Sequence, residues 1–165
     1  MLHLYWGDGK GKTTAAVGLA LRALGHGRRV VVVQFLKDGT SGEIALLRRC
    51  GAEVHACPNA KFTWLMTDAE KADARRANTE LLRGVLAQPF DLLVLDEACA
   101  AHKNALVDEQ LLRTAAARAK ADAEVGLTGR EPAAGMQDAA DYSTEMRAVK
   151  HPYARGVTAR EGVEY

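Results

Sequence analysis

Aromatic residues are scarce in this chain of 165 residues, which contains three Phe, two Trp and four Tyr. Proteins that bind single-stranded nucleic acid usually stack the bases on several aromatic side chains, so this class of binding module is disfavoured. An excess of one charge is also lacking, because 22 Lys and Arg stand against 21 Asp and Glu. A near-neutral chain has no broad basic surface, and we expect no nucleic acid among its partners.

The sequence also lacks the patterns of a membrane or secreted protein. No stretch approaches the roughly 20 apolar residues that a membrane-spanning helix needs, and the apolar run Leu2–Trp6 reaches Gly7 too early for a signal peptide. The cysteines Cys50, Cys57 and Cys99 form no CxxC motif, and the five histidines show no metal-binding spacing. We therefore expect a cytoplasmic protein with reduced thiols and no membrane partner.

Apolar runs alternate with segments of helical periodicity along the chain. Four consecutive valines from Val30 favour a strand that is buried on both faces, as in a parallel sheet. Thr67 and Glu70 have the spacing of a capping box, and Pro89 ends the helix that they begin. The predicted strands are 2–6, 30–35, 52–56, 90–95, 124–127 and 142–144, and the predicted helices are 13–24, 42–49, 67–87, 108–120 and 132–139. This alternation predicts a three-layer α/β domain with a mostly parallel sheet that spans residues 1–165.

The most informative motif is a glycine-rich run between the first predicted strand and the first predicted helix, Gly7-Asp8-Gly9-Lys10-Gly11-Lys12-Thr13-Thr14. In this position backbone N–H groups and the helix dipole can bind phosphate oxygens. Lys12 would reach the terminal phosphates, and the hydroxyl of Thr13 would ligate Mg²⁺. The standard motif would have its first glycine at position 6, where this chain has Trp6. The nearest glycine is Gly7, so the loop is one residue shorter than the standard one. The alternative is a glycine-rich turn with a solvated lysine.

An acidic pair, Asp96 and Glu97, follows the apolar run Leu92–Leu95. Ligands of open parallel sheets bind at the C-terminal ends of the strands. We expect Glu97 to be the first metal ligand, with Asp96 beside it, whereas the alternative is a carboxylate that caps the next helix. The two motifs together predict a P-loop NTPase-like (RecA-like) domain that binds a magnesium–nucleoside triphosphate complex, and they leave open which bond is broken.

Further short sequence segments resemble the P-loop type of ATP:corrinoid adenosyltransferase. They follow one another in the same order along the whole chain. They are the phosphate loop with Ala15–Gly27, then Val33–Lys37, Phe62-Thr63-Trp64, Leu93–Glu97, Leu127–Arg130, Ala140-Asp141, Thr144–Met146, Lys150–Tyr153 and Gly162–Tyr165. Only the phosphate loop is specific by itself, but the ordered set is distinctive. The chain departs from the family at Trp6, where a small polar residue is usual, and at 131–133. We also expect it to lack the N-terminal extension that covers the corrinoid in some members.

The resemblance implies that a reduced Co(I) corrinoid, cobalamin or a cobyrinic acid precursor, attacks the 5′ carbon of ATP and expels triphosphate. ATP would be the co-substrate, the corrinoid the substrate, and Mg²⁺ or Mn²⁺ the metal. Lys12, Phe62 and Trp64 would be the catalytic residues, with the two aromatic side chains filling the lower face of the corrin so that Co(II) loses its axial ligand. Arg130 would bind ATP together with the phosphate loop. A homodimer is implied as well, and a flavoprotein is a candidate reductant.

Several alternatives remain at this point. Phe62 and Trp64 could instead pack in the core, and Arg130 could be a turn residue paired with an acid. The whole protein could be a P-loop ATPase or a small-molecule kinase, although no catalytic base for a phosphoryl acceptor is visible. It could also be a non-catalytic protein that binds a nucleotide or a corrinoid, an alternative that the tight loop motivates.

Overall fold

A six-stranded parallel sheet forms the centre of the structure, a computed structural model that describes residues 1–57, 61 and 63–164. The strand order is β3-β2-β4-β5-β1-β6, and every neighbouring pair is parallel. The strands are β1 Leu2–Trp6, β2 Val30–Gln34, β3 Glu53–Ala56, β4 Leu92–Asp96, β5 Glu124–Gly129 and β6 Tyr142–Glu145. The structure thus confirms the predicted parallel sheet, and it brings the C-terminal ends of all six strands to one edge.

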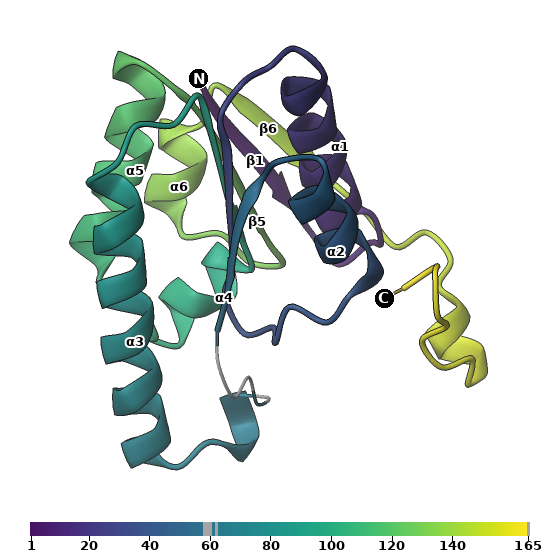
Figure 1. Cartoon of the computed structure of the whole chain (residues 1–165). Helices are drawn as coiled ribbons and strands as arrows, with labels where there is room; N and C mark the ends of the chain where they lie inside the picture. The colour runs from purple at the N-terminus through teal and green to yellow at the C-terminus, as the bar shows by residue number, and fades with distance from the viewer. Residues whose placement is uncertain (58–60, 62, 165) are drawn as a thin grey trace.

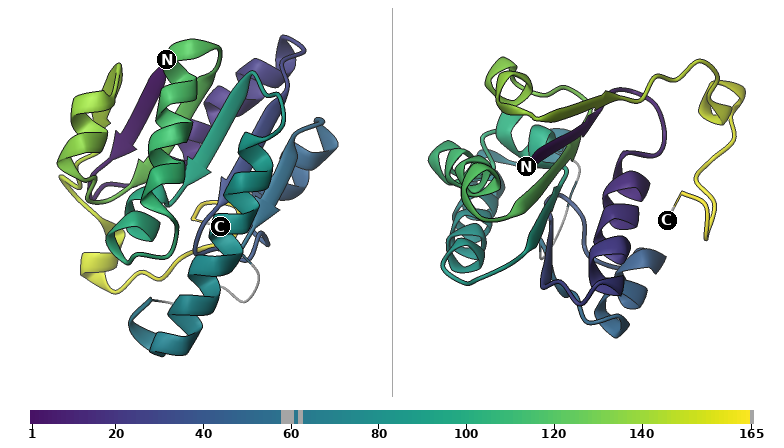
Figure 2. Two further views of the ribbon diagram at one scale, coloured as in Figure 1. Left: turned by 90° about the vertical axis from the view of Figure 1, so that its left-hand side faces the viewer. Right: turned by 90° about the horizontal axis from the view of Figure 1, so that it is seen from above.

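Helices cover both faces of this sheet and give three layers (Figures 1 and 2). Two of them, α1 Lys12–Gly25 and α2 Gly42–Arg49, lie on one face. Four lie on the other, namely α3 Asp68–Leu86, α4 Ala98–Lys103, α5 Glu109–Ala121 and α6 Ala134–Ala139. Short 3₁₀ helices occupy Thr63–Leu65 and Pro152–Arg155. Within the described ranges no helix is long and apolar enough to cross a membrane.

The valine-rich strand β2 shows why the sheet needs helices on both faces. Val31 and Val33 contribute to the core beneath α3 and α5, whereas Val30 and Val32 contribute to the core beneath α1 and α2. Successive side chains of a strand point to opposite faces, so a strand that is apolar at every position is stable only between two layers. The alternation of the sequence therefore specifies the layers as well as the strands.

The main departures from the predicted elements lie in short segments. The sequence pattern predicts no helix at 98–103, where α4 forms, because six residues are too few to show helical periodicity. The predicted helix 132–139 begins only at Ala134, after Pro132 and the extended N-cap residue Ala133. The capping box of α3 is confirmed, since Thr67 and Glu70 bond each other's backbone N–H groups. The longer helices α1, α3 and α5 therefore lie close to their predicted bounds, whereas α4, which follows the acidic pair, is absent from the prediction.

Candidate active site

The glycine-rich loop joins β1 to α1 and leaves the start of that helix open. Gly11, the N-cap residue, has φ 116°, and no side chain in the described ranges caps the helix. The first backbone N–H groups of such a helix have no partners within the helix, so they can bind an anion. The Lys12 ammonium lies over the loop and donates a hydrogen bond to the Gly9 carbonyl oxygen at 2.6 Å. Burial lowers the pKa of Lys12.

Gly7 and Gly9 pack against a later part of the chain. The N–H of Gly7 donates to the Arg130 carbonyl oxygen at 3.1 Å, and the N–H of Gly9 donates to the Met146 carbonyl oxygen at 2.7 Å. A Cβ atom would lie 2.4 Å from this Met146 oxygen at position 7 and 2.7 Å from it at position 9. Close backbone approach therefore requires glycine at both positions, and the N–H groups of these two residues are already occupied.

Two side chains of the loop hold the C-terminal segment. The carboxylate of Asp8 accepts a hydrogen bond from the Ala148 N–H at 3.0 Å, and this bond lowers the pKa of Asp8. The Lys10 ammonium donates to the Val163 carbonyl oxygen at 2.6 Å. The C-terminal segment consequently returns to the side of the sheet that carries α1 and α2, as Figure 1 shows.

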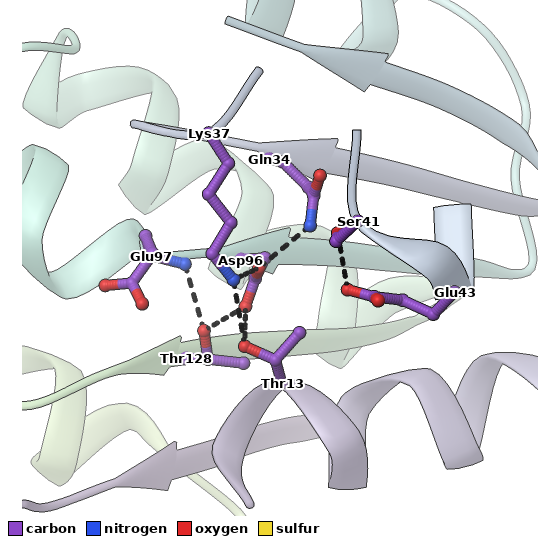
Figure 3. Close-up of polar contacts among 8 residues, drawn as sticks. All are labelled: Thr13, Gln34, Lys37, Ser41, Glu43, Asp96, Glu97 and Thr128. Atoms are coloured by element: carbon purple, nitrogen blue, oxygen red, sulfur yellow. Dashed lines mark hydrogen bonds and ion pairs between the residues drawn. The ribbon is translucent and has the colours of Figure 1, made fainter. Parts of the chain in front are cut away.

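Asp96, the last residue of β4, is the centre of a buried polar cluster at the edge of the sheet (Figure 3). Its Oδ1 accepts hydrogen bonds from the hydroxyls of Thr13, at 2.9 Å, and Thr128, at 2.7 Å. Its Oδ2 accepts from the Gln34 amide at 3.2 Å and from the Lys37 ammonium at 2.6 Å. Four donors satisfy a carboxylate that is only 1% exposed, which a buried charge requires.

The Lys37 ammonium contacts two members of this cluster. Besides its ion pair with Asp96, it donates to the Thr13 hydroxyl oxygen at 3.1 Å. Lys37 follows Leu36, whose φ of 59° is in the left-handed region, and the Lys37 carbonyl accepts a hydrogen bond from the Cys57 N–H at 3.1 Å. The backbone after β2 is thus turned and held so that Lys37 reaches the end of β4.

Glu97 has a different environment from Asp96. Its backbone is left-handed, with φ 60°, and its N–H donates to the Thr128 hydroxyl oxygen at 2.9 Å. Figure 3 shows its carboxylate turned away from the Asp96 cluster. Burial, and then the neighbouring Asp96 charge, raise the pKa of Glu97, while the charges of Lys37, Lys12 and Arg130 act in the opposite direction. Asp96, the residue that the sequence analysis placed second, is therefore the acid that contacts Thr13.

A cavity of about 910 Å³ opens in front of the start of α1. It is lined by Thr13 and Thr14 of α1, by Lys37 and the rest of the loop before α2, and by C-terminal residues 162–164. Its volume lies in the range of roughly 300–1,000 Å³ that is usual for small-molecule sites. The residues that line it place the start of α1, a cation and hydroxyl groups around one space.

Of the two predicted aromatic residues, the structure describes one. Trp64 lies in the 3₁₀ helix, and 74% of its surface is exposed, so it is not a core residue and the packing alternative fails for it. Its neighbour Leu65 is 63% exposed and lines the cavity. Phe62 lies outside the described residues.

Sequence reasoning did not assign three residues of the Asp96 cluster to the site, namely Gln34, Lys37 and Thr128. Gln34 ends β2, and Thr128 lies near the end of β5, so their positions at the ligand-binding edge were the available signal. Cys99 is a core residue, since it is 1% exposed and packs in the hydrophobic cluster beneath α3 and α5, and burial raises its pKa to about 12. The Oε1 atom of Gln34 is buried and has no hydrogen-bond partner among the described residues.

The oxygen atoms at this edge fit a magnesium ion that is shared with phosphates. Among the described residues, no group of three or more His, Cys, Asp or Glu could hold a metal by itself. Mg²⁺ usually takes only one or two protein carboxylates and completes its shell with water and phosphate oxygens. The Thr13 hydroxyl and the Asp96 carboxylate are ligands of this kind, and the Lys37 ammonium already places a positive charge on both of them.

The parallel sheet, the glycine-rich loop between β1 and α1, and the acidic strand end that contacts Thr13 define a P-loop type of nucleotide-binding fold. The family model described as ATP:corrinoid adenosyltransferase BtuR/CobO/CobP matches residues 1–165. This chain belongs to that family of transferases, which use ATP and a corrinoid as substrates. The match extends over the whole chain, as the ordered strings in the sequence indicated.

Curated relatives agree with the family. A corrinoid adenosyltransferase of Pseudomonas aeruginosa is 40% identical over 170 residues, which cover 100% of this chain and 83% of the relative. The corrinoid adenosyltransferase CobA of Salmonella typhimurium is 39% identical over 171 residues, which cover 100% of this chain and 85% of the relative. A corrinoid adenosyltransferase of Escherichia coli K12 is 35% identical over 170 residues, again with 100% and 85% covered. The similarity therefore includes both the phosphate loop and the C-terminal segment.

Proposed function

We propose that this protein transfers the 5′-deoxyadenosyl group of ATP to the cobalt of a Co(I) corrinoid, either cobalamin or cobyrinic acid a,c-diamide, in adenosylcobalamin synthesis or salvage. The family match over the whole chain carries this proposal. Cobalt supplies both electrons of the new cobalt–carbon bond and becomes Co(III). The bond between C5′ and oxygen breaks, and its electron pair leaves with the triphosphate.

The phosphate loop would bind the group that leaves. As the C5′–O bond breaks, negative charge grows on the triphosphate. Hydrogen-bond donors that already point at this group stabilise the charge without any rearrangement of the protein. The open start of α1 supplies N–H groups there, and Lys12 supplies a cation whose present acceptor is the Gly9 carbonyl oxygen. Lys10, Thr14 and Arg130 complete the proposed ATP site, together with the backbone of Gly7, Asp8, Gly9 and Gly11.

Thr13 and Asp96 would hold the metal. When bound, Mg²⁺ or Mn²⁺ would neutralise part of the triphosphate charge. The contact of 2.9 Å between Thr13 and Asp96 supports this pair, because it brings a carboxylate oxygen next to the hydroxyl of a residue that lines the cavity. Glu97 would act from farther away, through its charge.

Trp64 and Phe62 would bind the corrinoid. An indole that is 74% exposed costs free energy in water, and contact with a large flat ring would remove this cost. Trp64 also precedes Leu65, which lines the cavity. We further propose that residues 1–165 act as one domain, in a cytoplasmic homodimer that receives its electron from a flavoprotein. The family resemblance supports these last points.

An anaerobic assay tests the proposal. The protein is supplied with ATP, Mg²⁺ and chemically reduced cobalamin, and the products are separated. Light-sensitive adenosylcobalamin should form together with an equal amount of triphosphate. Release of only ADP and phosphate would indicate an ATPase or kinase, and tight binding of the corrinoid with no product would indicate a binding protein.

A further inference from the structure

Lys37 contacts both residues to which the proposed function assigns the metal. Its ammonium lies 2.6 Å from Asp96 Oδ2 and 3.1 Å from Thr13 Oγ1. We propose that Lys37 is a positioning residue that stands in for the metal: it holds the pair of Thr13 and Asp96 while the site is empty, and it moves to the triphosphate when Mg²⁺ enters with ATP. This inference rests on the proposed metal site.

The hydrogen bonds of Asp96 show why Lys37 and a metal would compete. A carboxylate has about four lone-pair positions, and all four are engaged, two on Oδ1 and two on Oδ2. A metal on Asp96 must therefore displace one donor. Gln34 and Thr128 are buried and neutral, at 1% and 0% exposed. Lys37 is charged, so it would repel the incoming cation.

Lys37 is also the donor that can move to another acceptor. The side chain of Lys37 is 32% exposed and lines the cavity in front of α1, together with Thr14 and Lys10. An ammonium carries three donors on a flexible stem, so it can leave a carboxylate for a phosphate without moving the backbone. In the new position its charge would add to that of Lys12 on the leaving triphosphate.

The local backbone indicates that this placement is specific. Leu36 adopts φ 59°, which a residue other than glycine rarely does, and such conformations persist where the surrounding structure holds them. Here the Cys57 N–H donates to the Lys37 carbonyl oxygen and also to the Gln34 carbonyl oxygen, both at 3.1 Å. These bonds fix the turn that directs Lys37 toward the end of β4.

Binding of Mn²⁺ to the nucleotide-free protein, followed by electron paramagnetic resonance, tests the inference. Lys37→Met removes the competing charge, and we expect it to tighten Mn²⁺ binding by at least about tenfold. Lys37→Arg keeps the charge and should bind Mn²⁺ as weakly as the unchanged protein. Lys120→Met, at an exposed position of α5, is the matched control and should change nothing. Equal Mn²⁺ affinity in Lys37→Met and the unchanged protein would overturn the inference.

Two further measurements keep the result clear. Lys37→Met leaves Asp96 without its cation, so Mn²⁺ should raise the melting temperature of this variant more than that of the unchanged protein. If Lys37→Met does not fold, Lys37→Gln, which keeps a donor without the charge, should show the same gain in Mn²⁺ affinity.

Mn²⁺ binding in the presence of ATP separates this inference from the proposed metal site. If Thr13→Val does not weaken Mn²⁺ binding, the proposed metal site itself is wrong. If Thr13→Val weakens it but Lys37→Met shows no gain, only the role of Lys37 is wrong.

Discussion

The hydroxyl of Thr13 donates a hydrogen bond of 2.9 Å to Asp96, a residue 83 positions further along the chain. The strands that carry the two motifs are not neighbours, because β5 lies between β1 and β4. Helix α1 packs across both β4 and β5, and in this way it brings its first turn over the end of β4. The phosphate loop and the acidic strand end therefore meet through a helix and not through strand pairing.

The first prediction concerns this contact. In Asp96→Asn, one carboxylate oxygen becomes an amide nitrogen, which cannot accept the two hydrogen bonds that either oxygen now receives. The metal would also lose a charged ligand. We expect adenosyl transfer to fall by about 100-fold, the upper part of the range for changes near a metal. Product formation as a function of Mg²⁺ concentration is the measurement.

Asp138→Asn is the matched control for this change, because Asp138 lies exposed on α6. Its rate should equal that of the unchanged protein. A normal rate and a normal Mg²⁺ dependence in Asp96→Asn would instead remove Asp96 from the metal site.

The second prediction concerns Lys12. Lys12→Ala removes the cation that the proposal places on the leaving triphosphate, and the loss of one such donor usually costs about 10²–10³ in rate. The fold should be retained, because within the described part of the chain the Lys12 side chain hydrogen-bonds only the Gly9 carbonyl oxygen. Rates of adenosyl transfer and circular dichroism spectra, with Lys120→Ala as the control, measure both effects. Unchanged transfer in Lys12→Ala would contradict the assignment of the phosphate loop.

The strands could be predicted well because their burial leaves a direct trace in the sequence. The valines of β2 and the apolar run of β4 are buried on both faces, and that burial is visible as uninterrupted apolar sequence. The C-terminal ends of parallel strands must meet at one edge, so the position of Asp96 near a phosphate loop also followed. These features depend on local composition and on one rule of topology.

The partners of Asp96 could not be predicted in the same way. Gln34 and Thr128 approach it because β2 and β5 flank β4, and strand order is not encoded locally. The sequence also does not show that the backbone of Glu97 is left-handed, at φ 60°, which places the two neighbouring acids in different environments. The position of Lys37 next to Asp96 depends on the left-handed turn at Leu36, and no sequence pattern indicates that turn.

The third prediction concerns the stability of the loop. A Cβ atom at Gly9 would lie 2.7 Å from the Met146 carbonyl oxygen, so Gly9→Ala must displace backbone. We expect the free energy of unfolding to fall by about 1–3 kcal/mol. Gly84→Ala is the matched control: it lies in α3 with nothing within 4 Å of the added atom, and it should raise the free energy of unfolding by about 0.4–1 kcal/mol. Urea unfolding of both variants checks the two signs.

The fourth prediction concerns thiol reactivity. Burial raises the pKa of Cys99 to about 12, and thiols react as thiolates, so at pH 8 almost none of its reactive form is present. Cys57 is also buried and its pKa is raised, whereas Cys50 is exposed. Iodoacetamide at pH 8 should therefore modify Cys50 in the native protein, and all three residues in urea. Mass spectrometry of the labelled peptides measures this, and Cys50→Ser should leave the native protein almost unlabelled. Rapid native labelling of Cys99 would contradict its placement.

The last prediction concerns Trp64 and separates its proposed role from simple binding. If its indole excludes the axial ligand of Co(II), its loss must slow the reduction of cobalt more than the transfer that follows. Starting from a Co(II) corrinoid with a reductant, we expect Trp64→Ala to react more slowly by roughly tenfold, as about 1.4 kcal/mol of lost aromatic contact would give. Starting from Co(I) prepared beforehand, the rate should change much less. Tyr142→Ala is a suitable control, because this aromatic side chain is 51% exposed and lies at the start of β6, away from the C-terminal ends of the strands. An equal loss from both starting states would mean that Trp64 serves corrinoid binding in general. Because the indole is 74% exposed, the variant should keep its melting temperature, so a loss of rate cannot be attributed to unfolding.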